Sequence, residues 1–581
     1  MRAIAYDLLK RVISLLLGLA GVVTIIFAIP YFAPGGPERA LVGWPFTAER
    51  ATALRAHYGF DRPLPEQYAL WVRNLVRGEW GRSKYTGRPI MRELEITFPL
   101  TLKLLAETVG LAVLFAALLA MLAIRSGNRT EQTRGQGIRV VAMGFPDFYF
   151  GILVKFFFVW HLEWFPIGGL TFFAERPWQA FRQLLLPALS VGLLYGMMSG
   201  PRVASRLAAG AGMPEEGSAD GGLVNGGHVW RQFPKALGIS LLVLSEHGGS
   251  LLGSLMLVEK IFAIPGFGDY GVEAFLRRDY PKVQAFLAIS VSAYVVLRVL
   301  VSGVEAALQR RALRTRSRLL FESPLKLNKG LGGLLMHDGF FFGVVLVVAI
   351  VATTLFAGHV APYLPDEVHM QDRLQPPKTQ YWMGSDLLGR DMLSRVIHGG
   401  RYSLMVAALG ATGALMLGVG LGGLPRLAGR VGIALATPLV RMLESFPTLM
   451  LGMLMMTLMG QGYLHEIVAL SVALAAQLAA VFLRVPVDTP ARFPVSCRAL
   501  VAAWLSAVAM AIILEATLNF LDMGLLPLIP SWGGDLKANF PYLHVNPAIV
   551  LFPGIAVVMA ALGFHLMAES VQKHMVGARA S

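Results

Sequence analysis

Two stretches of this chain match each other: FPDFYFGIL at residues 145–153 and FPTLMLGML at residues 446–454. Both begin with Phe-Pro and place glycine seventh and leucine ninth. A glutamate and a glycine nine residues apart then follow each stretch, Glu259 with Gly268 and Glu515 with Gly524. Two matching pairs in the same order indicate an internal repeat. The chain is therefore predicted to contain two homologous halves.

The composition places these halves in a membrane. The 581 residues are 55% hydrophobic and 15% charged, with a mean hydropathy of +0.58, which is outside the range of ordinary soluble domains. A membrane-spanning helix needs about 20 mostly apolar residues. Apolar windows lie near 12–32, 99–124, 138–160, 184–200, 237–258, 284–307, 340–358, 403–424, 433–458, 464–483, 499–521 and 547–568. We predict an all-α polytopic membrane protein with about 12 transmembrane helices in two parallel six-helix repeats.

Positive charges predict the topology. Arg2, Lys10 and Arg11 precede the first span, which we interpret as a retained span and not a signal peptide, so the N-terminus is expected in the cytoplasm. An even number of spans also places the C-terminus there. The predicted domains are a first half at 1–308 with an external subdomain at 33–98, a basic cytoplasmic linker at 309–338 and a second half at 339–581.

The sequence lacks the motifs of several other function classes. The formal net charge of +15 is accompanied by no nucleic-acid motif, and many basic residues flank apolar windows, so no nucleic-acid partner is expected. Cys497 is the single cysteine, which excludes a multi-cysteine metal site. The sequence contains no phosphate-binding glycine loop, zinc spacing or nucleophile elbow, so neither a catalytic nor a metal site is predicted.

Further motifs resemble a known family, the paired permease subunits of bacterial dipeptide, oligopeptide and nickel ABC importers. The first half is similar to one subunit of that pair through Gly78-Glu-Trp-Gly81-Arg-Ser83 and Pro265-Gly-Phe-Gly268. The second half is similar to the other subunit through Gly384-Ser-Asp-Leu-Leu-Gly-Arg-Asp391 and Pro530-Ser-Trp-Gly533. The resemblance covers nearly the whole chain. It implies the fold of a type I ABC importer permease, with both membrane subunits fused into one chain.

The resemblance also implies function and partners. The chain would be the permease of an importer that moves peptides, nickel or metal-chelate-like solutes from the periplasm to the cytoplasm across the bacterial inner membrane. Cytoplasmic ATPase subunits would hydrolyse ATP, so this chain would be no enzyme and need no cofactor. A periplasmic substrate-binding protein would deliver the cargo, docking at Asp386, Arg390 and Asp391, and membrane lipid would surround the helices.

Ionisable residues inside apolar windows are candidates for the transport path, because a charge at the bilayer centre is costly and usually faces a pore or a partner. The candidates are Lys103, Glu107, Lys155, Glu246, His247, Arg441, Glu444 and Glu515. We assign Glu246, His247 and Glu444 to the substrate path, with structural pairing as the alternative, and add the aromatic residues Phe145 and Phe446 of the repeated stretches. Glu259 and Glu515 recur near the external end of each half, and we assign them to gate packing and positioning.

The segments that should contact the ATPases depart from the family. Glycines at 217–227 weaken any helix in the first-half loop, and only a basic stretch from His228 to Lys235 remains plausible. We expect His228, Trp230, Arg231 and Lys235 to contact the ATPase. The second-half loop at 484–498 contains three prolines spaced by four, which disfavour a regular docking helix. Two alternatives therefore stay open: a transporter or channel of this fold without conventional ATPase coupling, and a membrane receptor for a periplasmic binding protein.

Overall fold

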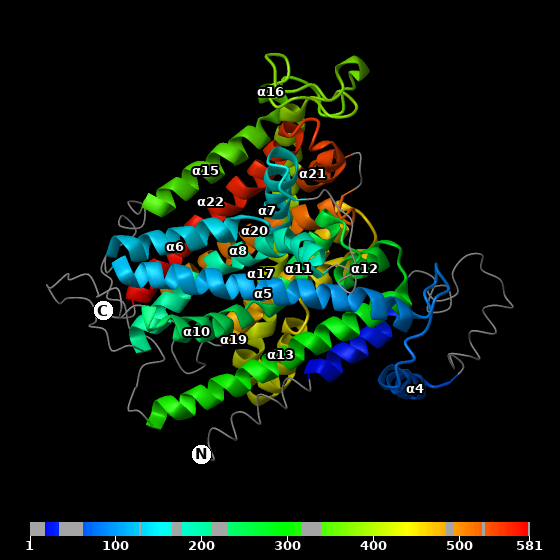
Figure 1. Cartoon of the computed structure of the whole chain (residues 1–581), viewed down its shortest axis with the longest axis vertical. Coiled ribbons are helices and arrows are strands. Elements are labelled where there is room, and N and C mark those ends of the chain that lie inside the picture. The colour runs from blue at the N-terminus through cyan, green and yellow to red at the C-terminus, as the bar shows by residue number, and fades with distance from the viewer. Residues whose placement is uncertain are drawn as a thin grey trace.

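The fold was obtained as a computed structural model, and the structure describes residues 18–33, 62–126, 129–165, 177–210, 230–314, 338–483, 493–525 and 529–578. Within these ranges the chain forms helices and turns, with two isolated β-bridges and no named strand. The all-α, polytopic architecture expected from the sequence is confirmed (Figure 1).

The first half begins with an apolar helix at Gly18–Phe32. Its other elements are α4 (Leu64–Val76), α5 (Ile90–Ser126), α6 (Arg129–Gly144), α7 (Asp147–Lys155), the π-helix η1 (Phe156–His161), α8 (Pro177–Gly210), α10 (Phe233–Ser245), α11 (Gly248–Phe262), α12 (Phe267–Leu276) and α13 (Tyr280–Arg314). The second half contains α15 (Asp338–Leu355), α16 (Ala357–Val360), η2 (Met370–Asp372), α17 (Met392–Glu444), α18 (Thr448–Met459), α19 (Tyr463–Leu483), α20 (Phe493–Phe520), α21 (Trp532–Asn539), η3 (Phe540–Tyr542) and α22 (Ala548–Ala578).

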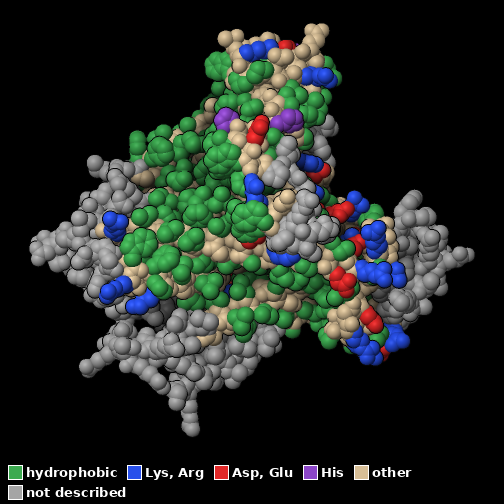
Figure 2. Space-filling model, viewed as in Figure 1, with side chains coloured by type: hydrophobic (Ala, Val, Ile, Leu, Met, Phe, Trp, Pro, Cys, Tyr) green, Lys and Arg blue, Asp and Glu red, His purple; other side chains and the backbone are tan. Residues whose placement is uncertain are grey.

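The described part of each predicted apolar window falls on these helices, and residues 12–17 of the first window lie outside the described residues. Among the described residues, seven helices are long and apolar enough to cross a membrane, or nine if each of two bent pairs counts as one span. The bent pairs are α6 with α7 and η1, at 89°, and α10 with α11, at 81°. Figure 2 shows hydrophobic side chains over the helical body and charged side chains gathered toward its ends. This distribution is that of a multi-pass membrane protein.

The repeated Phe-Pro stretches break helices at corresponding places. Pro146 is the N-cap of α7, and Pro447 is the N-cap of α18. Proline disfavours helical geometry in the residue before it, so the preceding helix ends there. Helix α17 has a further break at Gly429, whose φ of 53° and ψ of −126° are non-helical. The second half of α17 together with α18 therefore corresponds to α6 together with α7.

Small residues set the packing within each half. A side-chain carbon on Gly196 of α8 would lie 2.6 Å from Phe115 Cβ of α5. In the second half, a side-chain carbon on Gly418 of α17 would lie 2.7 Å from Leu478 Cβ of α19. Such close approach of backbones is the usual way in which helices associate in lipid, where no hydrophobic effect drives them together. The helix pairs α5 with α8 and α17 with α19 thus form matching cores.

The two halves also contact each other in a reciprocal way. Gly144 of α6 lies against Leu562 of α22, where an added Cβ would be 3.1 Å from Leu562 Cβ. Gly21 of the first helix lies against Met442 of α17, where an added Cβ would be 2.6 Å from the Met442 sulfur. A helix at the edge of each half therefore packs on the bend of the other half. We call this contact region the seam between the halves.

Some predicted regions lie partly outside the described residues. These are most of the linker at 309–338, residues 34–61 of the external subdomain, residues 211–229 with His228, and residues 484–492. Helix α13 continues to Arg314, inside the range predicted as linker. The stretch after Val301 contains no proline and several strong helix formers, which explains the continuation. The boundaries of the predicted domains stay predictions.

Candidate functional site

A buried glutamate near the C-terminal end of α11 ties three elements of the first half together. Glu259 is fully buried, and its carboxylate accepts a hydrogen bond from the Thr101 hydroxyl of α5. The backbone N–H of Phe267, the first residue of α12, donates to the Thr101 hydroxyl at 2.7 Å. The Asp269 N–H donates to the second oxygen of Glu259 at 2.9 Å. The glutamate therefore fixes α12 against α5.

The second half repeats this arrangement. Glu515 of α20 is also fully buried, and the Ser403 hydroxyl of α17 donates to it at 2.9 Å. The backbone N–H of Trp532, the first residue of α21, donates to the Ser403 hydroxyl at 3.3 Å. We call these two arrangements the glutamate tethers: Glu259 with Thr101 and Phe267, and Glu515 with Ser403 and Trp532. Their contacts are those expected for positioning, while a role in gating stays a prediction.

The tethers also correct the alignment of the two halves. Spacing from the glutamate paired Gly268 with Gly524. In the structure, however, the stretch that starts α21 at the tether is Pro530 to Gly533, matching Pro265 to Gly268 at the start of α12. Gly524 instead packs against Asn519, whose side chain accepts a hydrogen bond from the Leu525 N–H. The spacing rule failed because the second half has extra residues between its glutamate and α21.

The second tether includes another carboxylate that the sequence reasoning missed. Glu466 of α19 is fully buried, and the Asn519 amide donates to Glu466 at 2.8 Å and to Glu515 at 3.0 Å. The two carboxyl groups thus share one amide donor. Glu466 was hard to find because it begins an apolar helix, where an acidic residue in the first turn is usual.

The loops before α5 and α17 form a second repeated feature. An isolated bridge joins Arg82 to Pro89 in the first loop and Ser385 to Asp391 in the second. Gly87 and Gly389 both have positive φ, at 65° and 74°, a conformation that glycine adopts without steric cost. The Gly384–Arg395 string singled out in the sequence therefore has a counterpart of similar length in the first half.

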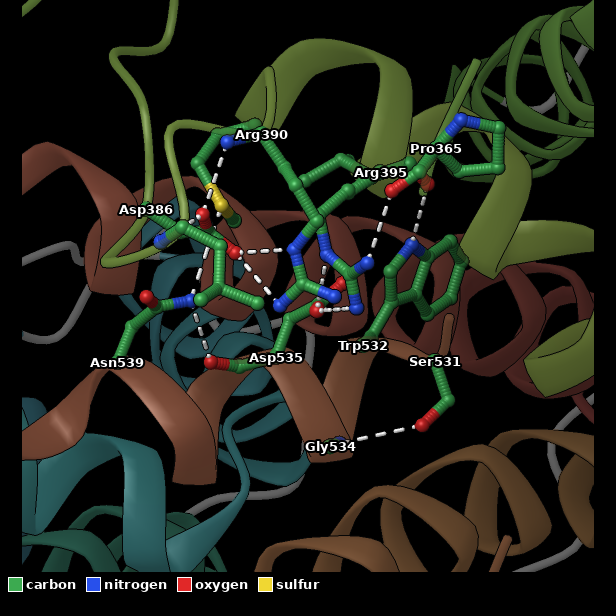
Figure 3. A network of polar contacts seen from close by, with 12 residues as sticks. Pro365, Asp386, Arg390, Arg395, Ser531, Trp532, Gly534, Asp535 and Asn539 are labelled. Atoms are coloured by element: carbon green, nitrogen blue, oxygen red, sulfur yellow. Dashed lines mark hydrogen bonds and ion pairs between the residues drawn. The ribbon is translucent and has the colours of Figure 1, made fainter. Parts of the chain in front are cut away.

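The three residues predicted to dock a binding protein mainly hold their own loop together, and two of them, Asp386 and Arg390, are labelled in Figure 3. Arg390 forms an ion pair with Asp386 at 2.6 Å, and the Asp386 side chain is almost fully buried. Asp391 caps the start of α17 by accepting hydrogen bonds from the Ser394 N–H at 2.8 Å and hydroxyl at 2.6 Å. Contact with a partner stays a prediction for this loop.

A buried ion pair below this loop fixes it to α21. Arg395 Nε donates to Asp535 Oδ1 at 2.7 Å, and a second guanidinium nitrogen donates to the Pro365 carbonyl at 2.9 Å (Figure 3). The side chains are only 5% and 1% exposed. Burial raises the pKa of the Asp535 carboxyl, and the Arg395 guanidinium opposes that rise. The pairing could not be anticipated because 140 residues separate the partners.

The first half also has a buried ion pair close to its tether, with an acidic residue at the position that Arg395 has in the second half. Lys282 of α13 bonds Glu93 of α5 at 2.7 Å, and the two side chains are 8% and 14% exposed. Glu93 precedes the tether hydroxyl of Thr101 by the same interval as Arg395 precedes Ser403. Among the described residues, each half thus places a buried charge pair eight residues before the hydroxyl of its tether.

Two of the residues assigned to the path, Glu246 and His247, lie at the bend between α10 and α11. This bend packs on the second Phe-Pro break, where a Cβ on Gly249 would lie 3.8 Å from the Pro447 Cα. Glu246 pairs with Arg206 at 2.7 Å and with Arg202 at 3.4 Å, which is the structural alternative raised from the sequence. The His247 ring contacts the Val243 carbonyl at 3.3 Å. Their assignment to a path stays a prediction.

The remaining path residues lie at the two Phe-Pro breaks. Phe145 stacks edge-on against Phe150 at 6.0 Å between ring centroids. Phe446 is buried, whereas Glu444 at the end of α17 is exposed. Both breaks face the other half of the molecule, through the contacts of Gly144 and Met442 described above.

The predicted ATPase contacts lie at the start of α10. Trp230 is exposed and lies 5.9 Å from the Phe233 ring, between centroids. Arg231 and Lys235 are exposed beside it. In the other loop, Phe493 begins α20, whose first turn accommodates a proline. An exposed tryptophan at a helix start offers an apolar anchor for a partner.

Comparison with known proteins agrees with this geometry. Residues 5–101 match the family described as binding-protein-dependent transport system membrane component, N-terminal region. A probable peptide ABC transporter permease of Sinorhizobium fredii is 27% identical over 51% of this chain and 95% of its own length. A probable D,D-dipeptide transport system permease of Escherichia coli is 29% identical over 50% of this chain and 93% of its own length. A glutathione transport system permease of Salmonella paratyphi A is 27% identical over 52% of this chain and 96% of its own length.

The fold and the two tethers define a multi-pass membrane protein with a duplicated architecture. The relatives are single permease subunits that each span about half of this chain. The resemblance to peptide ABC transporter permeases is thereby confirmed, and the chain is similar to a fusion of two such subunits.

Proposed function

We propose that this chain supplies both membrane halves of an ABC importer that carries peptides into the cytoplasm. The observation that carries the proposal is the duplicated glutamate tether, which gives both halves the same external framework around one seam. A path on the axis between parallel repeats is the arrangement expected when two equivalent units form one transporter.

The cargo is proposed from the relatives, which are named as carriers of peptides, D,D-dipeptides and glutathione. All three names describe peptides, and no name among them supports nickel or a metal chelate. We therefore propose peptides as the cargo and do not propose nickel or a metal chelate. The chain itself performs no chemistry in this proposal, needs no cofactor and crosses the inner membrane with both termini in the cytoplasm.

The proposal includes two kinds of partner. Cytoplasmic ATPases would bind at the Trp230 end of α10, and a periplasmic binding protein would dock over the loops that precede α5 and α17. The loop before α17 lies beside α21, because Arg395 pairs with Asp535. The loop before α5 lies beside the end of α12, because the Ser83 hydroxyl and the Lys84 N–H donate to Asp279. Ligand delivery from that side would reach the seam directly.

Uptake by living cells tests the proposal. Cells with the chain deleted, and the same cells complemented with the wild-type chain, are given labelled dipeptides and tripeptides with and without an inhibitor of ATP synthesis. We expect uptake only in complemented cells with ATP. Equal uptake in deleted and complemented cells would refute peptide import, and ATP-independent uptake would favour the alternative of a transporter without ATPase coupling.

A further inference from the structure

A lysine lies buried at the seam between the two halves. Lys155 ends α7 and immediately precedes the π-helix η1, and the residue is 6% exposed. Single π-helical turns are rare and often occur at functional positions. The ammonium donates a hydrogen bond to the Ile261 carbonyl of α11 at 2.6 Å. Lys155 therefore holds a positive charge inside the protein at a break in helical geometry.

Three aromatic rings surround the ammonium. Its nitrogen lies 5.4 Å from the centroid of Trp160 and 5.5 Å from those of Phe262 and Phe540. Phe540 belongs to the second half, so the cage is completed across the seam. Ring faces attract cations, most strongly when water is excluded. We call these three rings with the Ile261 carbonyl the lysine cage.

The cage stabilises the ammonium without neutralising it. The contacts described for Lys155 are one carbonyl and three rings, and no ion pair joins it to a carboxylate of the described residues. An ammonium has three N–H donors, and the one carbonyl uses a single donor. A buried charge within a membrane segment is costly and usually has a partner. The position thus has the capacity to bind an anion.

A purely structural explanation accounts for only part of this arrangement. A cation near the last carbonyls of α11 interacts favourably with the helix dipole. The second half, however, needs no such charge. The register of the two Phe-Pro stretches pairs Lys155 with Met456, a buried residue at the corresponding place in α18. The fold therefore accepts an uncharged side chain at this position.

The neighbours of Lys155 place it on the surface where the halves meet. Phe148 of α7 stacks on Phe520 of α20 with 4.9 Å between centroids. The Tyr149 hydroxyl donates to the Leu551 carbonyl of α22 at 2.9 Å. A molecule that crosses between the halves on this side would separate Phe540 from the lysine cage and expose the ammonium.

We propose that Lys155 binds the carboxylate of the cargo as the cargo passes the external end of the seam. This inference rests on the proposed function, because it names the chemical class of the cargo: peptides with a free C-terminal carboxylate. The carboxylate would replace the Ile261 carbonyl and the face of Phe540 as partners of the ammonium. Charge-assisted hydrogen bonds to a carboxylate are about twice as strong as neutral ones, which favours the exchange.

Uptake of matched peptides tests this role. Cells that express the full chain with its partner subunits receive a labelled dipeptide with a free carboxylate or its C-terminal amide, and the ratio of the two uptake rates is measured. A binding protein is the same in every strain, so its own preference cancels between strains. We expect Lys155→Met to lower the ratio about 10- to 100-fold, the usual value of a hydrogen bond to a charged group. Lys155→Arg should keep most of the ratio, and Met456→Leu should leave it unchanged.

A binding measurement separates this inference from the proposed function. The full chain in lipid nanodiscs is equilibrated with a labelled N-acetyl dipeptide or its amide, and retention is compared for the wild type and Lys155→Met. If wild-type cells take up neither peptide but nanodiscs still prefer the carboxylate through Lys155, peptide import fails and the lysine site stands. If Lys155→Met changes neither the uptake ratio nor the nanodisc preference, or lowers both peptides equally, the lysine site is overturned.

Discussion

Breaking the buried ion pair between Arg395 and Asp535 should destabilise the chain far more than breaking an exposed pair. Replacing Arg395 by methionine keeps much of the volume but leaves the Asp535 carboxylate, which is 1% exposed, without its cation. It also removes the donor to the Pro365 carbonyl. Breaking a buried pair by removing one partner costs about 3–5 kcal/mol, because an uncompensated charge stays buried. We therefore expect Arg395→Met to lower the free energy of unfolding by about 3–5 kcal/mol.

The chain offers a matched control. Arg277 and Glu273 form an ion pair at 2.9 Å on α12, but their side chains are 55% and 43% exposed. Exposed pairs of this spacing contribute about 0.3–0.5 kcal/mol. Arg277→Met should therefore change stability little. Replacing both Arg395 and Asp535 by apolar residues should recover most of the loss, since no unpaired charge then remains.

Heating the purified chain in detergent and measuring the folded fraction by size exclusion gives the midpoint for each variant. We expect the wild type, Arg277→Met and the double variant to unfold at similar temperatures. Arg395→Met and Asp535→Leu should unfold at clearly lower temperatures. If Arg395→Met behaves like Arg277→Met, the pair does not hold α21 and the reasoning from burial is wrong.

Two further predictions concern coupling and the first tether. Trp230→Ala should uncouple ATP hydrolysis from peptide uptake, because an aromatic anchor buried at an interface commonly contributes more than about 1–2 kcal/mol. Phe493→Ala should have a much smaller effect, and equal ATPase retention by both variants in pull-downs would contradict this prediction. Gly266→Ala should destabilise the chain markedly in the heating assay, because its Cβ would lie 2.4 Å from the Glu259 carboxylate. Gly238→Ala in α10 should be neutral or stabilising, because its Cβ meets nothing within 4 Å. Similar midpoints for both variants would show that the tether tolerates displacement.

The sequence predicted the helices and the duplication well, and the polar contacts poorly. Apolar windows and the Phe-Pro repeat are local patterns, so they could be found from the sequence alone. The structural counterpart of Pro265 to Gly268 was mispaired, because extra residues before Pro530 shift the spacing. Charged residues in the windows were found, but their partners were not.

The partners escaped prediction because they come from distant segments. Lys155 was a candidate from its position, yet its cage joins η1, α11 and η3. Arg395 lay inside a recognised string, but nothing near it in the sequence indicates Asp535. Which charges pair in a folded membrane protein depends on helix packing, and one sequence does not encode that packing in a readable pattern.

The central claim is that one chain supplies both permease halves of the importer. The most direct test is the native mass of the complex purified with its ATPase subunits from a membrane, measured in nanodiscs. We predict one copy of this chain with two copies of ATPase subunit, one at each half. A complex with two copies of this chain for two ATPase subunits, or a chain that retains no ATPase, would contradict the account.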